Sequence, residues 1–301
     1  MDQSEFESDR TKNCIIKSEV PEICRTEPCC LGIDEAGRGP VLGPMVYGIA
    51  YCPLSQQEKL KEMGLADSKT LSEEQRESML EKIKAAQDTV GWIVEILTPT
   101  YISNSMLRRT KYNLNALSHD SAIGLLQRAL SLGANITEVY VDTVGDPAKY
   151  QAKLKDIFPD IDITVAKKAD ATYPIVSGAS ICAKVARDQA VKSWQFRELL
   201  GKEGLEYGSG YPADPGTKKF LAENMDSVFG FPDFVRFSWS TAAQMIEKDC
   251  VQVRWEDDDE DETKSTGSAS LLSFFKKKTE DPRQQKHRFF SDRCLTQVTA
   301  L

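Results

Sequence analysis

The chain has 301 residues, of which 41% are hydrophobic, which is enough for one large folded core or two smaller ones. No stretch approaches the ~20 apolar residues of a transmembrane helix, and eight cysteines without a Cys-x-x-Cys spacing, beside two histidines, argue against a zinc site and for reduced thiols. The net charge of −8 excludes general electrostatic attraction of nucleic acid, so such a contact would need a local basic patch, metal ions or partner subunits.

The first third of the chain alternates short apolar runs with one helical segment. Residues 1–27 are polar and irregular, so we expect a flexible lead-in. Runs of β-branched, aromatic and other apolar residues predict strands at 30–33, 45–51 and 90–97. Residues 72–86 predict a helix before the third strand.

The middle of the chain predicts helices and strands in alternation. Leucines that recur near one face predict a long helix over 114–132, which ends at Gly133. Two apolar strands follow at 138–142 and 162–168, and residues 175–194 predict another helix. This order favours an α/β fold with a mixed sheet flanked by helices.

The composition changes towards the C-terminus. Residues 196–255 predict a helical, loop-rich portion appended to the α/β core, for which we expect the boundaries 28–195. From residue 256 a run of seven acids opens a segment rich in charged residues, serine and threonine, which cannot bury a core. We therefore expect residues 256–301 to be an acidic linker and a mostly disordered tail.

Three predicted strand ends each deliver a carboxylate. The first run ends in Asp34 and Glu35, and the two later strands end at or lead to Asp142 and Asp170. Converging carboxylates repel one another, so such a cluster requires bound cations or retained protons at neutral pH. Four acids suit a pair of hard divalent ions ~3.5–4 Å apart, which activate a water and hold a scissile phosphate. A solvated strand end is the alternative for Asp34 and Glu35 taken alone.

Two glycines around one arginine follow the first acids after a single alanine. Without side chains, Gly37 and Gly39 allow a ligand to approach the main-chain N–H groups; we call residues 37–39 the glycine loop. A dinucleotide-binding turn would open a helix, whereas Pro40 and another strand follow here. A serine or cysteine triad would need a well-placed histidine, and His119 lies inside the predicted long helix.

Five short motifs carry a family resemblance. They are Gly32-Ile33-Asp34-Glu35-Ala36-Gly37-Arg38-Gly39-Pro40, Asp67-Ser68-Lys69, Val141-Asp142, Lys168-Ala169-Asp170 and Gly208-Ser209-Gly210-Tyr211-Pro212. In this order, between about residue 31 and residue 240, they resemble the motifs of type 2 ribonuclease H. The length and the acidic linker resemble the catalytic A subunit of the eukaryotic three-subunit members. The resemblance implies a ribonuclease H-like fold with two accessory subunits, B and C.

The resemblance also implies a chemistry. The residues matching the family's acids, Asp34, Glu35, Asp142 and Asp170, would be catalytic and would bind two Mg²⁺ ions, for which Mn²⁺ can substitute. Family members hydrolyse the RNA strand of RNA/DNA hybrids and cut 5′ of a single ribonucleotide in duplex DNA, leaving 3′-hydroxyl and 5′-phosphate ends. Removal of ribonucleotides and RNA primers from DNA implies a nuclear location. Another two-metal polynucleotidyl transferase and a catalytically silent hybrid-binding subunit remain alternatives.

Several substrate contacts are implied by the same resemblance. The main chain of Gly37, Arg38 and Gly39 would contact the ribose 2′-hydroxyl, the only chemical difference at such a nucleotide. Arg38 itself could contact a phosphate or hold the loop. Tyr211 would contact that hydroxyl and pack on the adjacent deoxyribose. Lys69 matches a basic residue near the scissile region, although a loop lysine is usually only solvated.

The residue types suggest further contacts. Asn113 and Asn115 begin the long helix, where side-chain amides and the N-terminal dipole could bind phosphate, although Asn115 could equally cap the helix. Lys184 and Arg187 follow Asp170 on the next helix and predict outer-face charges rather than substrate contacts.

The tail holds one peptide-like segment. Residues 268–275 place Leu271, Phe274 and Phe275 at the spacing of a sliding-clamp-binding peptide, although Ser268 stands where glutamine is usual. Docking of the same apolar residues on the accessory subunits is the alternative.

Overall fold

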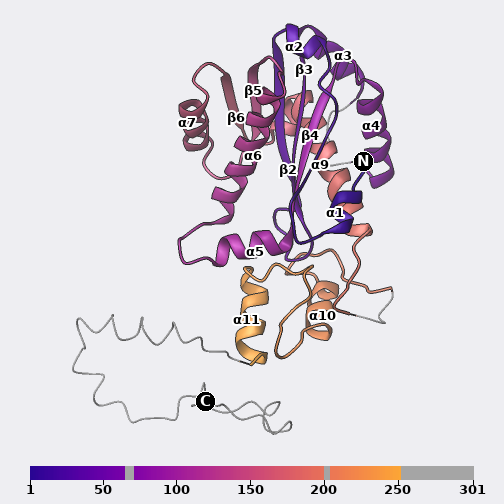
Figure 1. Cartoon of the computed structure of the whole chain (residues 1–301), viewed down its shortest axis with the longest axis vertical. Coiled ribbons are helices and arrows are strands. Elements are labelled where there is room, and N and C mark those ends of the chain that lie inside the picture. The colour runs from indigo at the N-terminus through magenta and orange to yellow at the C-terminus, as the bar shows by residue number, and fades with distance from the viewer. Residues whose placement is uncertain (65–70, 200–203, 252–301) are drawn as a thin grey trace, which may run out of the picture. The chain divides into compact units, whose positions relative to one another are not determined.

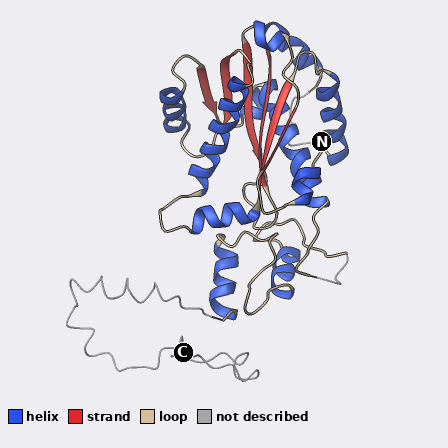
Figure 2. Cartoon of the chain, in the orientation of Figure 1, coloured by secondary structure: helices blue, strands red, loops and turns tan. Residues whose placement is uncertain are grey.

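The computed structural model of the chain describes residues 1–64, 71–199 and 204–251. The described residues fall into two compact units, one within 1–225 and 231–243, the other of residues 226–230 and 244–251. A six-stranded sheet with helices on both faces is the centre of the first unit (Figures 1 and 2). The predicted α/β class, with a mixed sheet flanked by helices, is confirmed.

The sheet has the strand order β1-β4-β3-β2-β5-β6. Its strands are β1 (Cys14–Lys17), β2 (Cys29–Ala36), β3 (Met45–Pro53), β4 (Gly91–Leu97), β5 (Ile136–Asp142) and β6 (Asp162–Ala166). The four strands from β1 to β2 pair antiparallel, whereas β2–β5 and β5–β6 pair parallel. Because β2 and β5 run in the same direction, their carboxyl ends meet at one edge of the sheet.

Several helices of the described chain begin at a residue whose side chain caps them. The described helices are α1 (Ser4–Ser8), α2 (Ile23–Thr26), α3 (Gln57–Glu62), α4 (Glu73–Ala85), α5 (Pro99–Leu107), α6 (Leu114–Ser131), α7 (Pro147–Ile157), α8 (Ala169–Thr172), α9 (Pro174–Lys192), α10 (Pro215–Glu223) and α11 (Ser240–Asp249), with a 3₁₀ turn at Leu54–Gln56. Ser72 and Gln75 form a reciprocal capping box that starts α4. Asp146 caps α7, whose first residue is Pro147. None of the described helices is long and apolar enough to cross a membrane.

Residues 1–27 differ from the predicted irregular lead-in. They contain α1, β1 and α2, and β1 forms an edge of the sheet by pairing with β4. Phe6 of α1 is buried, and its ring centroid lies 6.0 Å from that of Trp194. Both partners lie far away along the chain, so local composition could not reveal this order. The tail predicted at 256–301 lies outside the described residues.

One face of the sheet packs unusually close to α9. Gly32 of β2 and Gly48 of β3 point to this face, and a Cβ added there would lie 2.5 Å from the Ile175 carbonyl oxygen and 2.7 Å from that of Ala179. The absence of side chains at both positions therefore lets the main chain of α9 rest directly on the strands. α9 is apolar where it meets the sheet, and α4 packs against it in turn (Figure 1).

The opposite face of the sheet carries the larger apolar core. Alternate strand residues such as Ile33, Ile49 and Val139 pack there against Leu117 and Leu125 of α6. α5 and α7 complete this layer with further buried residues. The strand alternation thus separates a close-packed glycine face under α9 from an aliphatic face under α6.

The second unit is small in its described part. The Asp226 carboxylate accepts hydrogen bonds from Val228 N at 2.7 Å and Phe229 N at 2.9 Å, which closes a turn. Val251 N donates to Ser227 O at 2.8 Å, which ties the end of the described chain to this turn.

Candidate metal centre and adjoining pocket

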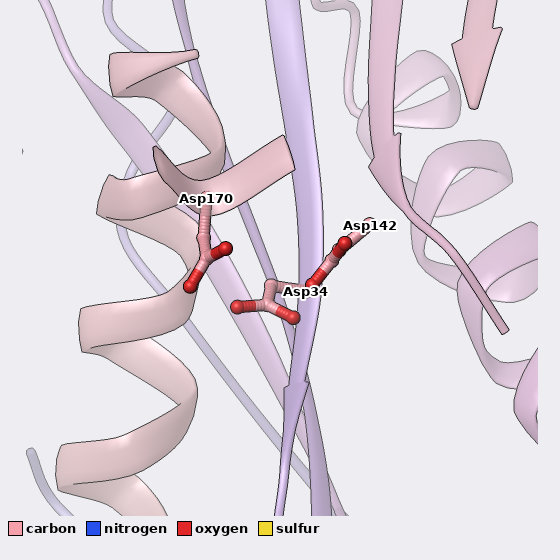
Figure 3. Close-up of side chains that lie close together, drawn as sticks. All are labelled: Asp34, Asp142 and Asp170. Carbon is pink, nitrogen blue, oxygen red and sulfur yellow. The ribbon is translucent and has the colours of Figure 1, made fainter. Parts of the chain in front are cut away.

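Three aspartates from different elements meet at the carboxyl edge of the sheet. Asp34 lies near the end of β2, Asp142 ends β5, and Asp170 belongs to α8 (Figure 3). One carboxylate oxygen of each lies within 4.8 Å of an oxygen of the other two. The parallel register, in which Ile33 lies beside Val141, places the first two next to each other. We call Asp34, Asp142 and Asp170 the aspartate group.

The third member is placed by a tight connection. Lys168 precedes α8 with φ of 55°, and it is the single non-glycine residue with positive φ in the described chain. This left-handed conformation costs of order 1–3 kcal/mol, and such strain persists only where the surroundings enforce it. Asp142 Oδ1 accepts a hydrogen bond from Ala169 N at 3.1 Å. The end of β5 therefore holds the start of α8, and with it Asp170.

The aspartate group carries unfavourable charge. Asp34 is only 6% exposed, and burial raises its pKa to about 7; the charge of Asp142 adds to this rise, whereas a hydrogen bond from Ser180 opposes it. Burial and repulsion together therefore outweigh the groups that stabilise the Asp34 carboxylate. Three converging carboxylate oxygens are the ligands that hard divalent ions prefer. The residues therefore fit a divalent metal.

Glu35 lies outside the aspartate group. Successive side chains of a strand point to opposite faces, so Glu35 of β2 points away from Asp34. It lines the neighbouring pocket, and its negative charge contributes to the raised pKa of Tyr47 and Tyr150, after burial. The structure thus corrects the expected single cluster of four acids: three converge, and the role of Glu35 as a fourth ligand stays a prediction.

A pocket of about 340 Å³ opens beside the glycine loop. Its lining consists of Glu35, Ala36, Gly37, Arg38, Gly39, Arg76, Lys184, Arg187, Asp188 and Tyr211. Four of these side chains are cationic and two are acidic, so the pocket suits an anionic ligand despite the negative charge of the whole chain. We call it the basic pocket.

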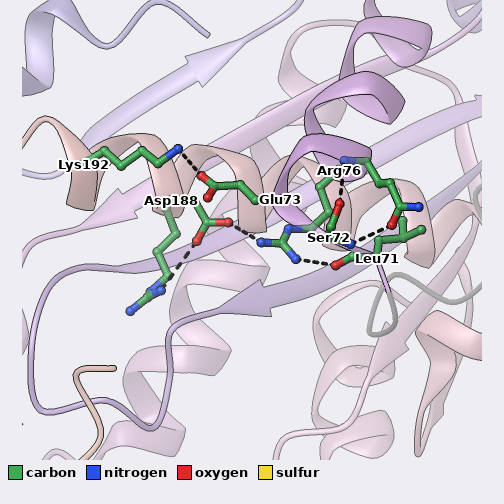
Figure 4. Close-up of polar contacts among 8 residues, drawn as sticks. Leu71, Ser72, Glu73, Arg76, Asp188 and Lys192 are labelled. Carbon is green, nitrogen blue, oxygen red and sulfur yellow. Dashed lines mark hydrogen bonds and ion pairs between the residues drawn. The ribbon is translucent and has the colours of Figure 1, made fainter. Parts of the chain in front are cut away.

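One carboxylate arranges two of the arginines of the basic pocket. Asp188 Oδ2 lies 2.7 Å from Arg76 Nη2, and its other oxygen lies 3.7 Å from Arg187 Nη1 (Figure 4). Arg76 Nη1 also donates to Leu71 O at 2.8 Å. These contacts link the start of α4 to α9. They hold both guanidinium groups in place while the surplus of positive charge in the pocket remains.

The glycine loop requires its glycines for two different reasons. Gly37 has φ of 73°, and a side chain there would collide with Arg187 and lie 2.9 Å from Pro44 O. Gly39 has no such φ, but a Cβ there would lie 3.0 Å from Tyr211 Cε1. Tyr211, which is 53% exposed, therefore packs its ring over the bare main chain of Gly39.

The structure gives different outcomes for the other residues that the sequence analysis considered. Asn113 is the helix cap, since its side chain accepts a hydrogen bond from Ala116 N at 3.0 Å. Asn115 instead accepts a hydrogen bond from Arg38, which connects α6 to the glycine loop. Lys69 lies outside the described residues. The expectation that Lys184 and Arg187 are outer-face charges is wrong, because both line the basic pocket.

Two contributors escaped the sequence analysis altogether. Arg76 lies on a helix that showed no link to the acids in the sequence, and only the fold brings it to the pocket. Arg236 is fully buried and donates hydrogen bonds to the carbonyls of Gly37 and Arg38. A basic residue between Val235 and Phe237 in an apolar run was the one available signal.

Comparisons with known proteins agree with this geometry. The family model described as Ribonuclease HII matches residues 31–242, which hold the whole sheet except β1 and the first residues of β2. The chain belongs to the ribonuclease HII family. The A subunit of ribonuclease H2 from Bos taurus is 54% identical over 301 residues, covering 100% of both chains, and that from Homo sapiens is 54% identical over 302 residues, again covering 100% of both.

Solved structures of the ribonuclease HII family share the fold. The ribonuclease H2 of Pyrococcus horikoshii OT3 is 35% identical, with a TM-score of 0.61, covering 73% of this chain and 98% of that chain. The RNase HII of the PCNA:RNase HII complex from Archaeoglobus fulgidus is 29% identical, with a TM-score of 0.59, covering 76% of this chain and 99% of that one. As a member of this family, the chain is a ribonuclease H, an endoribonuclease that acts on RNA/DNA hybrids.

Proposed function

We propose that this chain is the catalytic component of a nuclear, three-subunit ribonuclease H2 that also cuts duplex DNA on the 5′ side of a single ribonucleotide. The products would be 3′-hydroxyl and 5′-phosphate ends, and the roles would be removal of ribonucleotides and RNA primers from DNA. The observation that carries the proposal is the juxtaposition of the aspartate group with the basic pocket and the glycine loop.

The metal requirement follows from the donor set. Asp34, Asp142 and Asp170 would hold two Mg²⁺ ions, with Glu35 contributing from the pocket side, and Mn²⁺ can substitute. When bound, such ions neutralise the carboxylates, activate water and stabilise the charge of an in-line phosphoryl transfer. The chain's own part is to deliver converging carboxylates from β2, β5 and α8.

The basic pocket would bind the nucleic-acid backbone. Arg76, Lys184 and Arg187 present cationic groups beside the aspartate group, and phosphate oxygens are the natural anionic ligand for such groups. Asp188 would keep two of these side chains in a fixed orientation, so that binding loses less side-chain entropy. Phosphate contacts of this kind position the substrate without reading its sequence.

The glycine loop and Tyr211 would recognise the ribonucleotide. A bare main chain at Gly37 and Gly39 allows amide groups to approach a ribose 2′-hydroxyl, which an L side chain would obstruct. Tyr211 is partly exposed and packs on Gly39, so its ring is positioned to stack on the neighbouring sugar. Recognition and cleavage would thus occur at adjacent residues of one strand end.

Accessory proteins complete the proposal. The relatives from Bos taurus and Homo sapiens are named as A subunits, and the acidic chain offers little nucleic-acid attraction of its own, which supports accessory B and C subunits. An archaeal RNase HII has been solved in complex with PCNA, which motivates a weaker proposal that residues 268–275 bind a sliding clamp. These residues lie outside the described part of the chain. Absence of binding between the isolated tail peptide and the clamp would remove that idea.

One experiment tests the proposed activity. The purified chain, alone and with two accessory subunits, is incubated with three end-labelled duplexes: a hybrid, a DNA duplex with one ribonucleotide, and an all-DNA duplex, in Mg²⁺ or in EDTA. We expect Mg²⁺-dependent cleavage of the first two, on the 5′ side of the single ribonucleotide. Cleavage of the all-DNA duplex would indicate another two-metal nuclease. Binding without cleavage in the assembled complex would indicate a catalytically silent protein.

A further inference from the structure

A segment near the C-terminal end of the first unit runs along the chain that follows the glycine loop. Gly43 N donates to Phe234 O at 2.8 Å, Arg236 N donates to Val41 O at 2.9 Å, and Leu42 and Val235 form an antiparallel bridge. This short ladder joins residues that are almost two hundred positions apart in sequence. It brings the side chains of Arg236 and Trp239 against the glycine loop.

Arg236 is the central side chain of this contact. It is 0% exposed, and its guanidinium donates from Nε to Gly43 O at 2.8 Å, from Nη1 to Arg38 O at 3.1 Å and from Nη2 to Gly37 O at 2.6 Å. Within the described residues it has no ion pair with a carboxylate. A fully buried cation is therefore satisfied by main-chain carbonyls.

Trp239 binds the remaining carbonyl of the glycine loop. Its indole Nε1 donates to Gly39 O at 3.1 Å, and its ring lies 4.8 Å from Arg236 Cζ in a cation–π contact. Two side chains thus bind all three carbonyls of the glycine loop. We call Arg236 and Trp239 the carbonyl clamp.

The carbonyl clamp determines the direction of the loop amides. In a trans peptide the carbonyl of one residue and the N–H of the next point to opposite sides of the chain. When the clamp binds the carbonyls of Gly37 and Arg38, the N–H groups of Arg38 and Gly39 therefore turn away from the clamp. Both residues line the basic pocket.

A contribution to stability does not by itself explain why a buried cation occupies position 236. Burial lowers the pKa of Arg236 to about 9, which reflects the cost of removing the charged guanidinium from water. Well-packed apolar residues usually stabilise a protein at least as well as a buried charge does. What only the planar five-donor guanidinium supplies is simultaneous binding of several carbonyls in a defined geometry.

We propose that Arg236 and Trp239 are positioning residues of the enzyme: by holding the three carbonyls of the glycine loop, they orient the loop amides towards the ribose. The inference rests on the proposed recognition of the 2′-hydroxyl by this loop. It assigns to two residues outside the aspartate group a role in substrate discrimination, and none in metal binding.

The test uses Trp239→Phe in the assembled enzyme, because this substitution keeps an aromatic ring and deletes the Nε1 donor. Ser238→Ala is the matched control, since the Ser238 hydroxyl contacts Met106 Sδ at 3.5 Å and not the loop. We expect Trp239→Phe to lower kcat/KM on the one-ribonucleotide duplex about tenfold, as for one lost hydrogen bond. The Mg²⁺ midpoint and the thermal unfolding midpoint should match those of Ser238→Ala.

A competition measurement separates positioning from general structural damage. An all-DNA duplex has no ribose to discriminate, so it should inhibit Trp239→Phe as strongly as it inhibits the parent enzyme, while KM for the one-ribonucleotide duplex rises. Arg236→Lys should show the same pattern with a larger loss, because one ammonium replaces a three-donor fork.

The outcomes distinguish failure of the proposed function from failure of the positioning role. If the parent enzyme fails to cut the one-ribonucleotide duplex, the proposed function fails. If the parent cuts it and Trp239→Phe cuts it with unchanged kcat and KM, the carbonyl clamp is not a positioning device. A shifted Mg²⁺ midpoint, or equal weakening of all-DNA inhibition, would also overturn the inference, because it would show a general structural effect.

Discussion

Asp34 of the aspartate group and the glycine loop lie within a few residues of each other at the end of β2, but the two regions are built on opposite principles. The aspartate group assembles carboxylates that repel one another and leaves Asp34 buried with a raised pKa. The glycine loop has each of its carbonyls bound by a side-chain donor. The repulsion within the aspartate group therefore destabilises the fold until a cation binds. The carbonyls of the glycine loop, by contrast, already have hydrogen-bond donors. Damage to the two regions should separate activity from stability in different ways.

The strongest test of this contrast is Asp142→Asn. An asparagine oxygen can still accept the hydrogen bonds from Thr143 N and Ala169 N, at 3.0 and 3.1 Å, but the substitution removes a negative ligand. We expect cleavage to fall by about a thousandfold or more. The free energy of unfolding in EDTA, measured by urea titration, should be unchanged or higher because repulsion is relieved.

Two variants calibrate this result. Asp162→Asn, at the exposed start of β6, removes an aspartate from the neighbouring strand outside the aspartate group and should leave cleavage unchanged. Asp142→Ala, by contrast, leaves the Ala169 amide without its acceptor and should cost about 1 kcal/mol of stability in addition. Marked destabilisation by Asp142→Asn itself would contradict the view that the aspartate group is strained.

The second test is the pH dependence of stability without metal. The pKa of Asp34 rises from 3.8 to about 7 on folding, so between these values the folded state holds a proton that the unfolded chain has lost. This contribution is fully present below pH 3.8 and is lost as the pH rises through about 7. The free energy of unfolding should therefore fall with rising pH in this window, by up to about 1.4 kcal/mol per unit.

The contribution of Asp34 is isolated by comparison with Asp34→Asn. Urea unfolding in EDTA at pH 5, 6 and 7 should give a steeper fall for the parent protein than for the variant, which cannot titrate at this position. Other groups with raised pKa, such as Asp233, act equally in both proteins. If the free energy of unfolding fell equally steeply with pH in both proteins, the pKa of Asp34 would not be raised on folding.

The third test, Gly37→Ser, disturbs the glycine loop. A serine would adopt an unfavourable φ of 73° and would also displace Arg187. Gly64→Ser is the matched control, because Gly64 has φ of 73° as well but nothing within 4 Å of an added Cβ. Both should lose about 1–2 kcal/mol from backbone strain.

The difference between these two glycine variants measures the collision at the pocket. Gly37→Ser should lose further stability and about tenfold or more in kcat/KM at a temperature where both variants are folded, whereas Gly64→Ser should keep full activity. If both variants lost stability equally and Gly37→Ser kept its activity, the glycine loop would be only a structural turn.

The smallest effect is expected from Gly39→Ala. The added Cβ would lie 3.0 Å from Tyr211 Cε1, and the half-exposed tyrosine can move aside, so stability should change by less than about 0.5 kcal/mol. Cleavage of the one-ribonucleotide duplex should fall about three- to tenfold, because the ring is displaced from its place over the loop. Unchanged cleavage would separate Tyr211 from ribose recognition.

Much of the fold was accessible from local sequence. The predicted helix at 114–132 corresponds to α6, Leu114–Ser131, and the predicted strand at 45–51 lies within β3, Met45–Pro53. Both have strong apolar patterns. β1 was missed because its four residues owe their order to pairing with β4 rather than to their own composition. α7 was missed although Asp146 and Pro147 form a recognisable helix start.

The site was accessible wherever an apolar strand ended in an acid. Asp34, Asp142 and Asp170 were singled out because apolar, strand-like sequence precedes each of them. In the structure Asp34 and Asp142 lie on adjacent parallel strands, whereas Asp170 lies on α8, four residues after the end of β6. Successive side chains of a strand point to opposite faces, which accounts for the different orientation of Glu35. Arg76 and Arg236 could not be found, since their roles depend on contacts between segments separated by more than a hundred residues.

The close packing of α9 has a consequence for how this enzyme tolerates change. α8, which carries Asp170, directly precedes α9, and α9 rests on the sheet at Gly32 and Gly48. A methyl group at either glycine would push α9 away from the sheet, because the added carbon would lie too close to the main chain of the helix. Asp170, on the short helix α8 directly before α9, would then be shifted away from Asp34 and Asp142. Gly32 and Gly48, which lie outside the aspartate group and the lining of the basic pocket, thereby set the position of α8 and of the Asp170 carboxylate.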